Sequence, residues 1–311
     1  SATGTPIKVA QVTASDQDKD PLTYHMSLAF ADMLYVDAAG GVFLNGSFAP
    51  LVEECGYPRC SCAIDFECAP AVQVAVTVSD ALFHTEANLT LNLVDVDEPP
   101  FFTAAAAAAT LSVPERSAVG TAVAVVGGAV AAVDLDQADN AVAYSLSGPG
   151  AARFAIDAAT AALTVAVDSP QMDFETEPEY EVTVTATSGP AGAQQTDKIS
   201  YNIGVVDVNE APTLAPTHAF AMDEDARLGS RLSPAIEGAD VDGGAWGELA
   251  YTIEAQSAAP LDTGAAAWAI DGQSGVLELV APLDYERAHT YALTVRATDG
   301  GGLQVETAVT I

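Results

Sequence analysis

A repeat with a period of about 110 residues is the feature that most constrains the fold of this chain. Three blocks each run from a turn glycine (Gly4, Gly120 or Gly229) through an apolar stretch to an Asp-x-Asp pair and then a tyrosine. Repeats of this length form separate units, each of which buries a small core of its own. The chain is therefore predicted to be an array of similar domains.

Each block also contains a second shared passage, AIDFECAPAVQVAVTVSD, MDFETEPEYEVTVTATSG or LDYERAHTYALTVRATDG. In each passage an Asp-aromatic-Glu triplet precedes a run that alternates apolar and polar residues. Alternation with a period of two is typical of strands with one buried face, and helical periodicity is nowhere convincing. The repeat predicts an all-β fold of three tandem Greek-key β-sandwiches in an extended rod.

We expect the three repeats to occupy residues 1–98, 99–210 and 211–311. Glu115 and Glu224 precede the turn glycine by five residues, and the corresponding position of the first block would fall before Ser1. The final strand, LQVETAVTI, stops where a further linker is expected. We therefore expect a segment of a longer array, with a truncated first repeat and a third repeat without its following linker. Residues 119–133 are apolar but broken by glycines, so strands are expected there rather than a membrane span.

Acidic residues dominate the charge, with 43 Asp and Glu against 10 Lys and Arg and a net charge of −33. This charge repels nucleic acid and anionic lipid and makes cations the expected partners. The acidic residues lie in short groups that would repel themselves without a cation. The groups are DQDKD, DVDE, DLDQAD, DVNE and DEDA.

The linkers LVDVDEPPFF at 93–102 and VVDVNEAPTL at 205–214 present carboxylate and amide oxygens on an extended segment that contains proline. A set of only oxygen ligands is typical of a hard cation. Calcium fits irregular carbonyl-rich linkers better than magnesium, which demands a near octahedron and keeps its waters.

Over its whole length the sequence resembles tandem cadherin repeats. The residues that carry the resemblance are an x-Glu-x glutamate, an Asp-aromatic-Glu triplet in place of the family's DRE, a DxNDNxP-like linker, and an Asp-x-Asp pair and a late Asp in the following repeat. These motifs recur in the same order. The resemblance implies an extracellular protein with up to about three calcium ions at each complete junction.

For the second junction the resemblance implies two groups of ligands. The two ions nearer the second repeat would use Glu115, Asp173, Glu175, Asp207, Glu210 and Asp242. The third ion would use Asn209, Asp240, Asp242 and Asp299. Main-chain carbonyls of Val208 and Ala211 are expected to add ligands.

For the first junction the resemblance implies a less complete set of calcium ligands. The matching ligands are Asp65, Glu67, Asp95, Glu98 and Asp136. Asp97 stands where the family has asparagine, and Ser188 replaces the late aspartate. The third ion is therefore left with Asp97, Asp134 and Asp136, together with Asn140, and we expect it to bind weakly or to be lost.

Outer half-sites are expected at both ends of the chain, empty or poorly occupied in isolation. Their ligands would be Asp16, Asp18 and Asp80 at one end, and Glu224, Asp284 and Glu286 at the other. Both linkers lack the family's second asparagine, which is replaced by Pro99 and Ala211. Because that position is expected to contribute a carbonyl, we expect the replacement to be tolerated.

All four cysteines lie within CGYPRCSCAIDFEC, without a zinc-like spacing. We expect two disulfides formed in an oxidising compartment by Cys55, Cys60, Cys62 and Cys68, with three pairings open. This loop either braces the ligands Asp65 and Glu67 or is a stapled surface insertion. Glycosylation sequons begin at Asn45 and Asn88.

The motifs favour a mechanical function over catalysis. Asp-aromatic-Glu pairs recur in every block, whereas an active site is expected once, and the four histidines are scattered. We expect a calcium-rigidified extracellular rod segment in cell adhesion, with further repeats of the same chain and other cadherin-like proteins, including copies of itself, as partners. The alternative is a subunit of an extracellular filament or matrix, packed laterally through alanine-rich faces such as residues 104–110. An enzyme or a sugar-binding module is the least favoured class.

Overall fold

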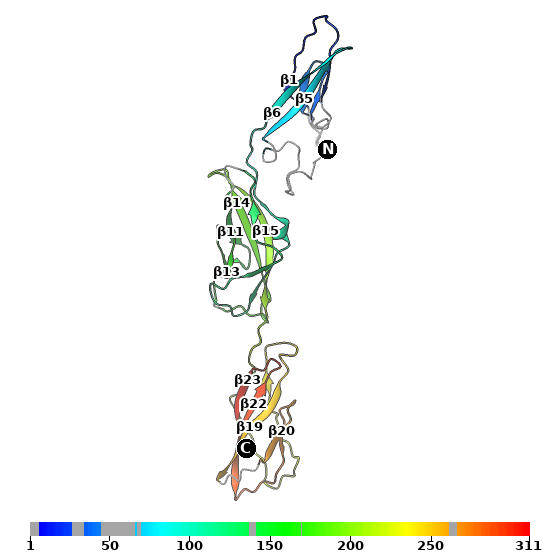
Figure 1. The fold of residues 1–311 in the computed structure, drawn as a ribbon. Coiled ribbons are helices and arrows are strands. Elements are labelled where there is room, and N and C mark those ends of the chain that lie inside the picture. Colours follow the sequence, from blue (N-terminus) through cyan, green and yellow to red (C-terminus); the bar gives the residue numbers. More distant parts are fainter. Residues whose placement is uncertain are drawn as a thin grey trace.

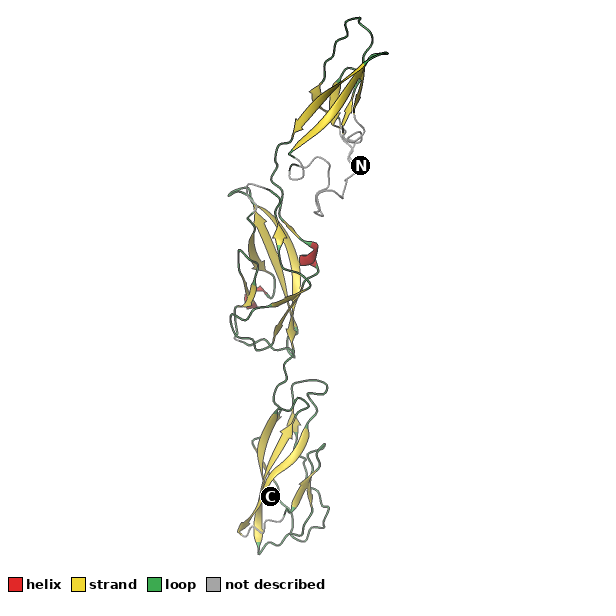
Figure 2. Cartoon of the chain, viewed as in Figure 1, coloured by secondary structure: helices red, strands yellow, loops and turns green. Residues whose placement is uncertain are grey.

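The computed structural model describes residues 6–26, 34–44, 66, 70–136, 141–168, 170–260 and 266–311. Its regular structure is almost entirely β-strand, in three groups that follow one another along the chain and lie end to end (Figures 1 and 2). This confirms the predicted all-β fold with tandem sandwiches. Within the described residues, no helix has the length and apolar character needed to cross a membrane.

The first group forms two three-stranded sheets, in the orders β1-β4-β3 and β2-β5-β6. Its core includes Leu34, Val42, Val72 and Val74. Among the described strands, β6 has β5 as its one neighbour. The strands are β1 Ile7–Gln11, β2 Thr23–Met26, β3 Leu34–Val36, β4 Gly41–Leu44, β5 Ala71–Ser79 and β6 His84–Asn92.

The second group is built around a five-stranded sheet in the order β11-β14-β15-β8-β9. Along β14 the residues alternate between outward and buried positions, as the sequence pattern predicts, and Val182 and Val184 are fully buried. The strands are β7 Phe101–Phe102, β8 Thr110–Pro114, β9 Ala124–Val126, β10 Ala132–Val133, β11 Ala143–Ser147, β12 Phe154–Ile156, β13 Leu163–Val165, β14 Glu179–Ser188 and β15 Gln195–Val206.

The alanine-rich segment after β7 differs from the prediction, because it forms a short helix, α1 Ala104–Ala107. Thr103 caps it by accepting a hydrogen bond from Ala106 N at 3.1 Å. Tyr201 on β15 donates its hydroxyl to the Ala106 carbonyl at 2.9 Å. Alanine is the best helix former, whereas its small side chain packs poorly in a strand. A 3-10 turn, η2 Ala151–Arg153, is a second departure from the purely strand-based prediction.

The third group repeats this plan with a four-stranded sheet in the order β17-β23-β22-β19. Its core surrounds Trp268, which is buried together with Leu277, Leu279 and Val295. The strands are β16 Thr213–Leu214, β17 Thr217–Ala219, β18 Gly238–Ala239, β19 Ala250–Pro260, β20 Trp268–Ile270, β21 Leu277–Leu279, β22 Ala288–Thr298 and β23 Gln304–Thr310.

Two features of this topology position the acidic motifs at the junctions. The last strand of the second and third groups pairs in parallel with an early strand, β15 with β8 and β23 with β17. Glu115 follows β8 directly, so the parallel pairing places it beside the end of β15, where the linker begins. Because β22 and β23 form an antiparallel hairpin, the turn between them at residues 299–303 returns to the linker end of the third group.

Candidate metal centre at the repeat junctions

The second junction is the segment between Val206, which ends β15, and Thr213, which begins β16. Acidic side chains reach it from the second repeat, the linker and the third repeat. Glu115 is 3 % exposed, and its two carboxylate oxygens accept from Phe174 N at 3.2 Å and from Val208 N at 2.8 Å. A single carboxylate therefore ties the Asp-Phe-Glu loop of the second repeat to the linker.

The third repeat holds the same linker from the other side. Asp242 Oδ2 accepts from Glu210 N at 2.8 Å, and Asp240 Oδ1 accepts from Asp242 N at 3.0 Å. Asn209 Nδ2 donates to Asp299 Oδ2 at 3.0 Å. The Asp-x-Asp turn and the late aspartate thus orient the linker through its main chain and its amide.

Five carboxylates form two overlapping clusters at this junction. Ligand oxygens of Glu115, Asp173 and Glu175 lie within 4.8 Å of one another, and so do those of Glu175, Asp207 and Asp242. Glu175 belongs to both clusters. Two unit charges about 4 Å apart repel each other by about 4 kcal/mol at an effective dielectric constant of about 20. Solvent reduces this repulsion at the exposed members of the clusters, Asp173 and Glu175, but the carboxylates still disfavour one another's ionisation.

Burial and the charges of neighbouring carboxylates raise several pKa values at this junction. Burial, followed by the charges of Asp242 and Glu115, raises the pKa of Asp207 above its ordinary value. Burial is also the largest cause that raises the pKa of Glu175 and of Asp240, with neighbouring carboxylate charges adding to it. The cluster thus resists full ionisation unless positive charge is brought in.

Buried oxygens without a hydrogen-bond partner show where such charge fits. An unpaired buried polar atom costs about 1–3 kcal/mol, so native proteins rarely contain many. Five such oxygens lie at the second junction, in a set made only of oxygen donors, which is the donor set that calcium prefers. The atoms are Asp207 Oδ1, Asn209 Oδ1, Glu210 Oε2, Asp240 Oδ2 and Asp242 Oδ1. The residues present therefore fit a hard divalent cation.

Arg116 is a member of the site that the sequence motifs did not reveal. It follows Glu115 in a left-handed backbone conformation (φ 54°), and its guanidinium forms an ion pair with Glu210. Glu210 is almost fully buried, so this arginine partly neutralises one linker carboxylate. In the sequence, only its position next to Glu115 could have pointed to Arg116. Its ion-pair partner Glu210 lies 94 positions away, and no local sequence pattern connects the two residues.

The first junction repeats the geometry of the Asp-x-Asp turn. Asp134 Oδ1 accepts from Asp136 N at 2.9 Å, and Asp136 Oδ2 accepts from Glu98 N at 2.9 Å. Asp134 Oδ2 and Asp136 Oδ1 are buried without a partner. Burial, with the charges of Asp134 and Asp97 adding to it, raises the pKa of Asp136. Asp95 lies in the linker and is exposed.

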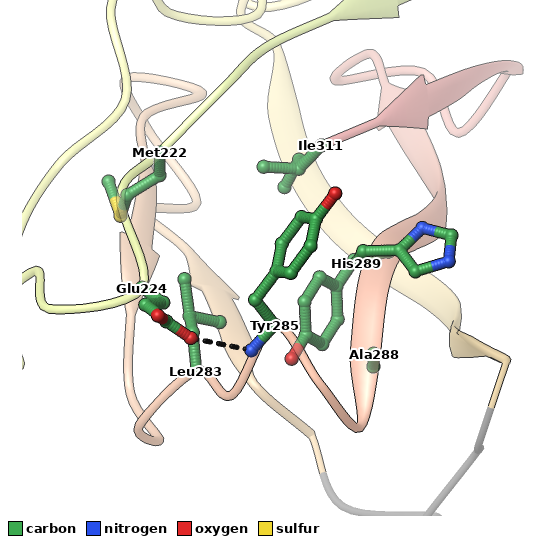
Figure 3. A pocket seen from close by; sticks show the side chains of 8 residues that line it. Met222, Glu224, Leu283, Tyr285, Ala288, His289 and Ile311 are labelled. Carbon is green, nitrogen blue, oxygen red and sulfur yellow. Dashed lines mark hydrogen bonds between the residues drawn. The ribbon is translucent and has the colours of Figure 1, made fainter.

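The cluster at the far end of the third repeat has the same local geometry as Glu115. Ligand oxygens of Glu224, Asp284 and Glu286 lie within 4.8 Å of one another, and all three residues are exposed. Glu224 Oε2 accepts from Tyr285 N at 2.7 Å, as Figure 3 shows. A pocket beside it is lined by residues that include Met222, Tyr285 and Ile311.

The predicted ligands of the opposite end make local hydrogen bonds. Asp16 Oδ1 accepts from Asp18 N at 2.8 Å, and Asp80 Oδ1 accepts from Leu82 N and Phe83 N. These two main-chain donors hold the pKa of Asp80 below its ordinary value. Such turns are the common role of aspartate in loops.

Several predicted residues lie outside the described part of the chain. They are Asp65, Glu67, Asn140, Asn45, Cys55, Cys60, Cys62 and Cys68. Asn88 is described and lies exposed on β6. Val208 and Ala211 lie in the second linker, and both are exposed.

Comparison with known proteins identifies the family of these repeats. The Cadherin domain family matches residues 109–206 and 218–311. Mouse protocadherin Fat 4 is 32% identical over 233 residues, 73% of this chain and 4% of its own length. Human protocadherin Fat 1 is 29% identical over 304 residues, 95% of this chain and 6% of its own length. The chain therefore spans only a small part of these curated relatives.

Solved structures show the same architecture. Mouse cadherin-23 EC22-24 superposes with a TM-score of 0.62 at 25% identity, covering 98% of this chain and 91% of that one. Protocadherin gamma C5 EC1-3 gives a TM-score of 0.64 at 19% identity, covering 99% and 96%, a likeness of fold. With its tandem β-sandwiches, its repeated acidic junction motifs and family matches over most of its length, the chain belongs to the cadherin family.

Proposed function

We propose that the chain is a calcium-binding, non-catalytic rod segment of a larger extracellular cadherin-like protein, stiffened by calcium at its junctions and used in cell adhesion. Its repeats would be residues 1–98, 99–210 and 211–311. Membership of the cadherin family supports an extracellular, adhesion-type segment. Its partners would be further repeats of the same chain and other cadherin-like proteins, including copies of itself.

One observation carries the proposal: five buried, unpartnered oxygens of the linker and the third repeat lie at the junction where Asp207 and Asp242 approach Glu175 of the second repeat. A bound calcium ion would supply the positive charge that relieves this repulsion. Glu115, Asp173 and Glu175 would hold it from the second repeat. Asp207, Asn209 and Glu210 would hold it from the linker, and Asp240, Asp242 and Asp299 from the third repeat.

The mechanical consequence follows from where these residues lie. Without a cation the linker is held by few hydrogen bonds, and like charges push the two repeats apart. Ligands on both repeats that share a cation remove the rotational freedom of the linker, because its residues must keep one conformation to keep their contacts. The array then behaves as a stiff rod rather than as separate domains joined by flexible linkers.

A calcium titration by calorimetry at about pH 7 and about pH 5.5 tests the proposal. We expect binding with Kd of about 10⁻⁴–10⁻³ M, the range of extracellular calcium modules, and weaker binding at the lower pH. The raised pKa values of Asp207, Glu175 and Asp240 mean that these groups hold protons at higher pH than usual. Protons therefore compete with calcium as the pH falls through those raised values.

The calcium-free protein should respond to pH in the opposite sense. Ionised carboxylates with raised pKa values destabilise the folded state, and protonation removes that penalty. Thermal stability without calcium should therefore rise as the pH falls from about 7 toward the ordinary carboxyl pKa of about 4. Magnesium at the same concentration is the control. The absence of calcium binding heat, or equal binding of magnesium, would contradict the proposal.

A further inference from the structure

The first junction contains a hydrogen-bond clamp that the sequence motifs did not reveal. Gln195, the first residue of β15, donates its Nε2 amide to Asp97 Oδ2 at 3.0 Å and also to the Asp97 main-chain oxygen. Both residues are half-buried, and they are 98 positions apart in the chain. The amide therefore fixes the main chain and the carboxylate of one linker residue together.

The second junction holds the same pair of groups with their places exchanged. Asn209 stands at the linker position of Asp97, and it donates its amide to Asp299 in the turn of the third repeat. In the second repeat Ser188 stands at the position of Asp299. The carboxylate has thus moved from the hairpin turn to the linker, and the amide has moved from the linker to the hairpin.

The surroundings of Asp97 match this exchange. Gly189 has φ 88°, and a Cβ there would lie only 3.1 Å from Asp97 Oδ2, so a larger residue would crowd the carboxylate. Ser188 and Asp136 are each 3 % exposed, and the Ser188 hydroxyl and Asp136 Oδ1 are buried without a hydrogen-bond partner. These unpartnered atoms, next to a clamped carboxylate, mark a ligand position rather than a solvated turn.

We propose that Gln195 is a positioning residue that presents Asp97 as the replacement for the missing aspartate at position 188, so that the first junction keeps its third cation. The inference rests on the proposed function and deepens it. Three carboxylates, Asp97, Asp134 and Asp136, then serve the first junction, as Asp240, Asp242 and Asp299 serve the second. This reverses the expectation from sequence that Ser188 weakens or abolishes the third site.

The test compares the two junctions within one molecule by following backbone amide NMR signals during a calcium titration of the full chain. The Glu98 and Glu210 amides are matched reporters, because each donates to the second aspartate of the Asp-x-Asp turn at its own junction. Asp97→Asn should weaken calcium binding at the Glu98 reporter by about tenfold or more and leave the Glu210 reporter unchanged. The double variant Asp97→Asn, Ser188→Asp recreates the second junction's arrangement and should restore binding.

Gln195→Met tests the positioning role separately, because it keeps the side-chain length and removes the donor. Loss of a group that orients a metal ligand typically costs about 10–100-fold in affinity, so we expect about tenfold at the Glu98 reporter. Exchange of the amides around Asp97 in chelator should also become faster, a readout that needs no calcium. Variants that do not fold would be recognised by the loss of dispersed signals, and Gln195→Glu, which keeps the shape, would then replace methionine.

The outcomes separate the inference from the function on which it rests. Calcium-induced shifts at neither reporter in the wild-type chain would contradict the proposed function. If calcium shifts the Glu210 signal but neither Asp97→Asn nor Gln195→Met changes the response at Glu98, the positioning role of Gln195 is overturned and the proposed function is not. Failure of the double variant to recover affinity would show that Asp97 and position 188 do not exchange roles.

Discussion

Replacing Asp242 with asparagine is expected to lower the calcium affinity of the second junction by about a hundredfold while the third repeat stays folded. Asp242 is 6 % exposed, and it shares one cluster with Glu175 and Asp207. Its Oδ2 accepts from Glu210 N, a bond that an asparagine carbonyl can keep. The substitution therefore removes the charge and a ligand but not the hydrogen bond that orients the linker.

The measurement is the same reporter titration, with calorimetry as a second readout. Glu181→Gln is the matched control, because it removes one negative charge from an exposed position of β14. We expect the control to bind calcium as the wild type does. In calcium-free buffer Asp242→Asn should be at least as stable as the wild type, since it relieves repulsion. Unchanged affinity in Asp242→Asn would contradict the assignment of this cluster as the centre of the junction.

Replacing Trp268 with alanine is expected to destabilise the third repeat by about 3–5 kcal/mol. The indole is 2 % exposed and packs edge-to-face on Tyr291, with ring centroids 6.4 Å apart. A loss of this size is a large share of the stability of one domain. For a domain of about 100 residues, each kcal/mol lowers the melting temperature by about 4–8 °C.

Trp268→Ala should also abolish the calcium response of the second junction and leave that of the first junction unchanged. Where the third repeat unfolds, its proposed ligands Asp240, Asp242 and Asp299 should leave the second junction, and the calcium response at Glu210 should disappear. The response at Glu98 should remain, because the second repeat has its own core. Trp246→Ala is the control, since that indole is 36 % exposed and its loss should cost less than about 1 kcal/mol. Equal losses from both tryptophans would contradict this account of the core.

Local patterns predicted the strands well because alternation and turn residues act over a few positions. The runs YEVTVTAT and YALTVRAT lie in β14 and β22, where alternate apolar residues are buried, among them Val182 and Val184 in β14 and Leu293, Val295 and Ala297 in β22. The short helix at Ala104–Ala107 was not predicted, because helix propensity and the Thr103 cap outweighed the place of this segment in an all-β repeat. Four alanines carry too little periodicity to reveal a helix from sequence.

The sequence predicted the acidic residues of the candidate site but not the two residues, Gln195 and Arg116, that hold the linkers. Asp and Glu recur at fixed places in each block, so repetition itself indicated which carboxylates meet. Gln195 and Arg116 contact linker residues far away in sequence, and neither has a counterpart at the same place in the other repeats. The amide and the carboxylate exchange places between linker and hairpin from one junction to the other, and only the geometry of both junctions reveals this.

Small-angle X-ray scattering of the full chain, in calcium and in excess chelator, tests the central claim most directly. In calcium we expect the curve of a stiff rod of end-to-end repeats with one well-defined maximum dimension. In chelator we expect a smaller average radius of gyration and a distribution of shapes, as repulsion and free rotation loosen the linkers. Identical curves in the two buffers would contradict the claim that the acidic junctions stiffen this segment by binding calcium.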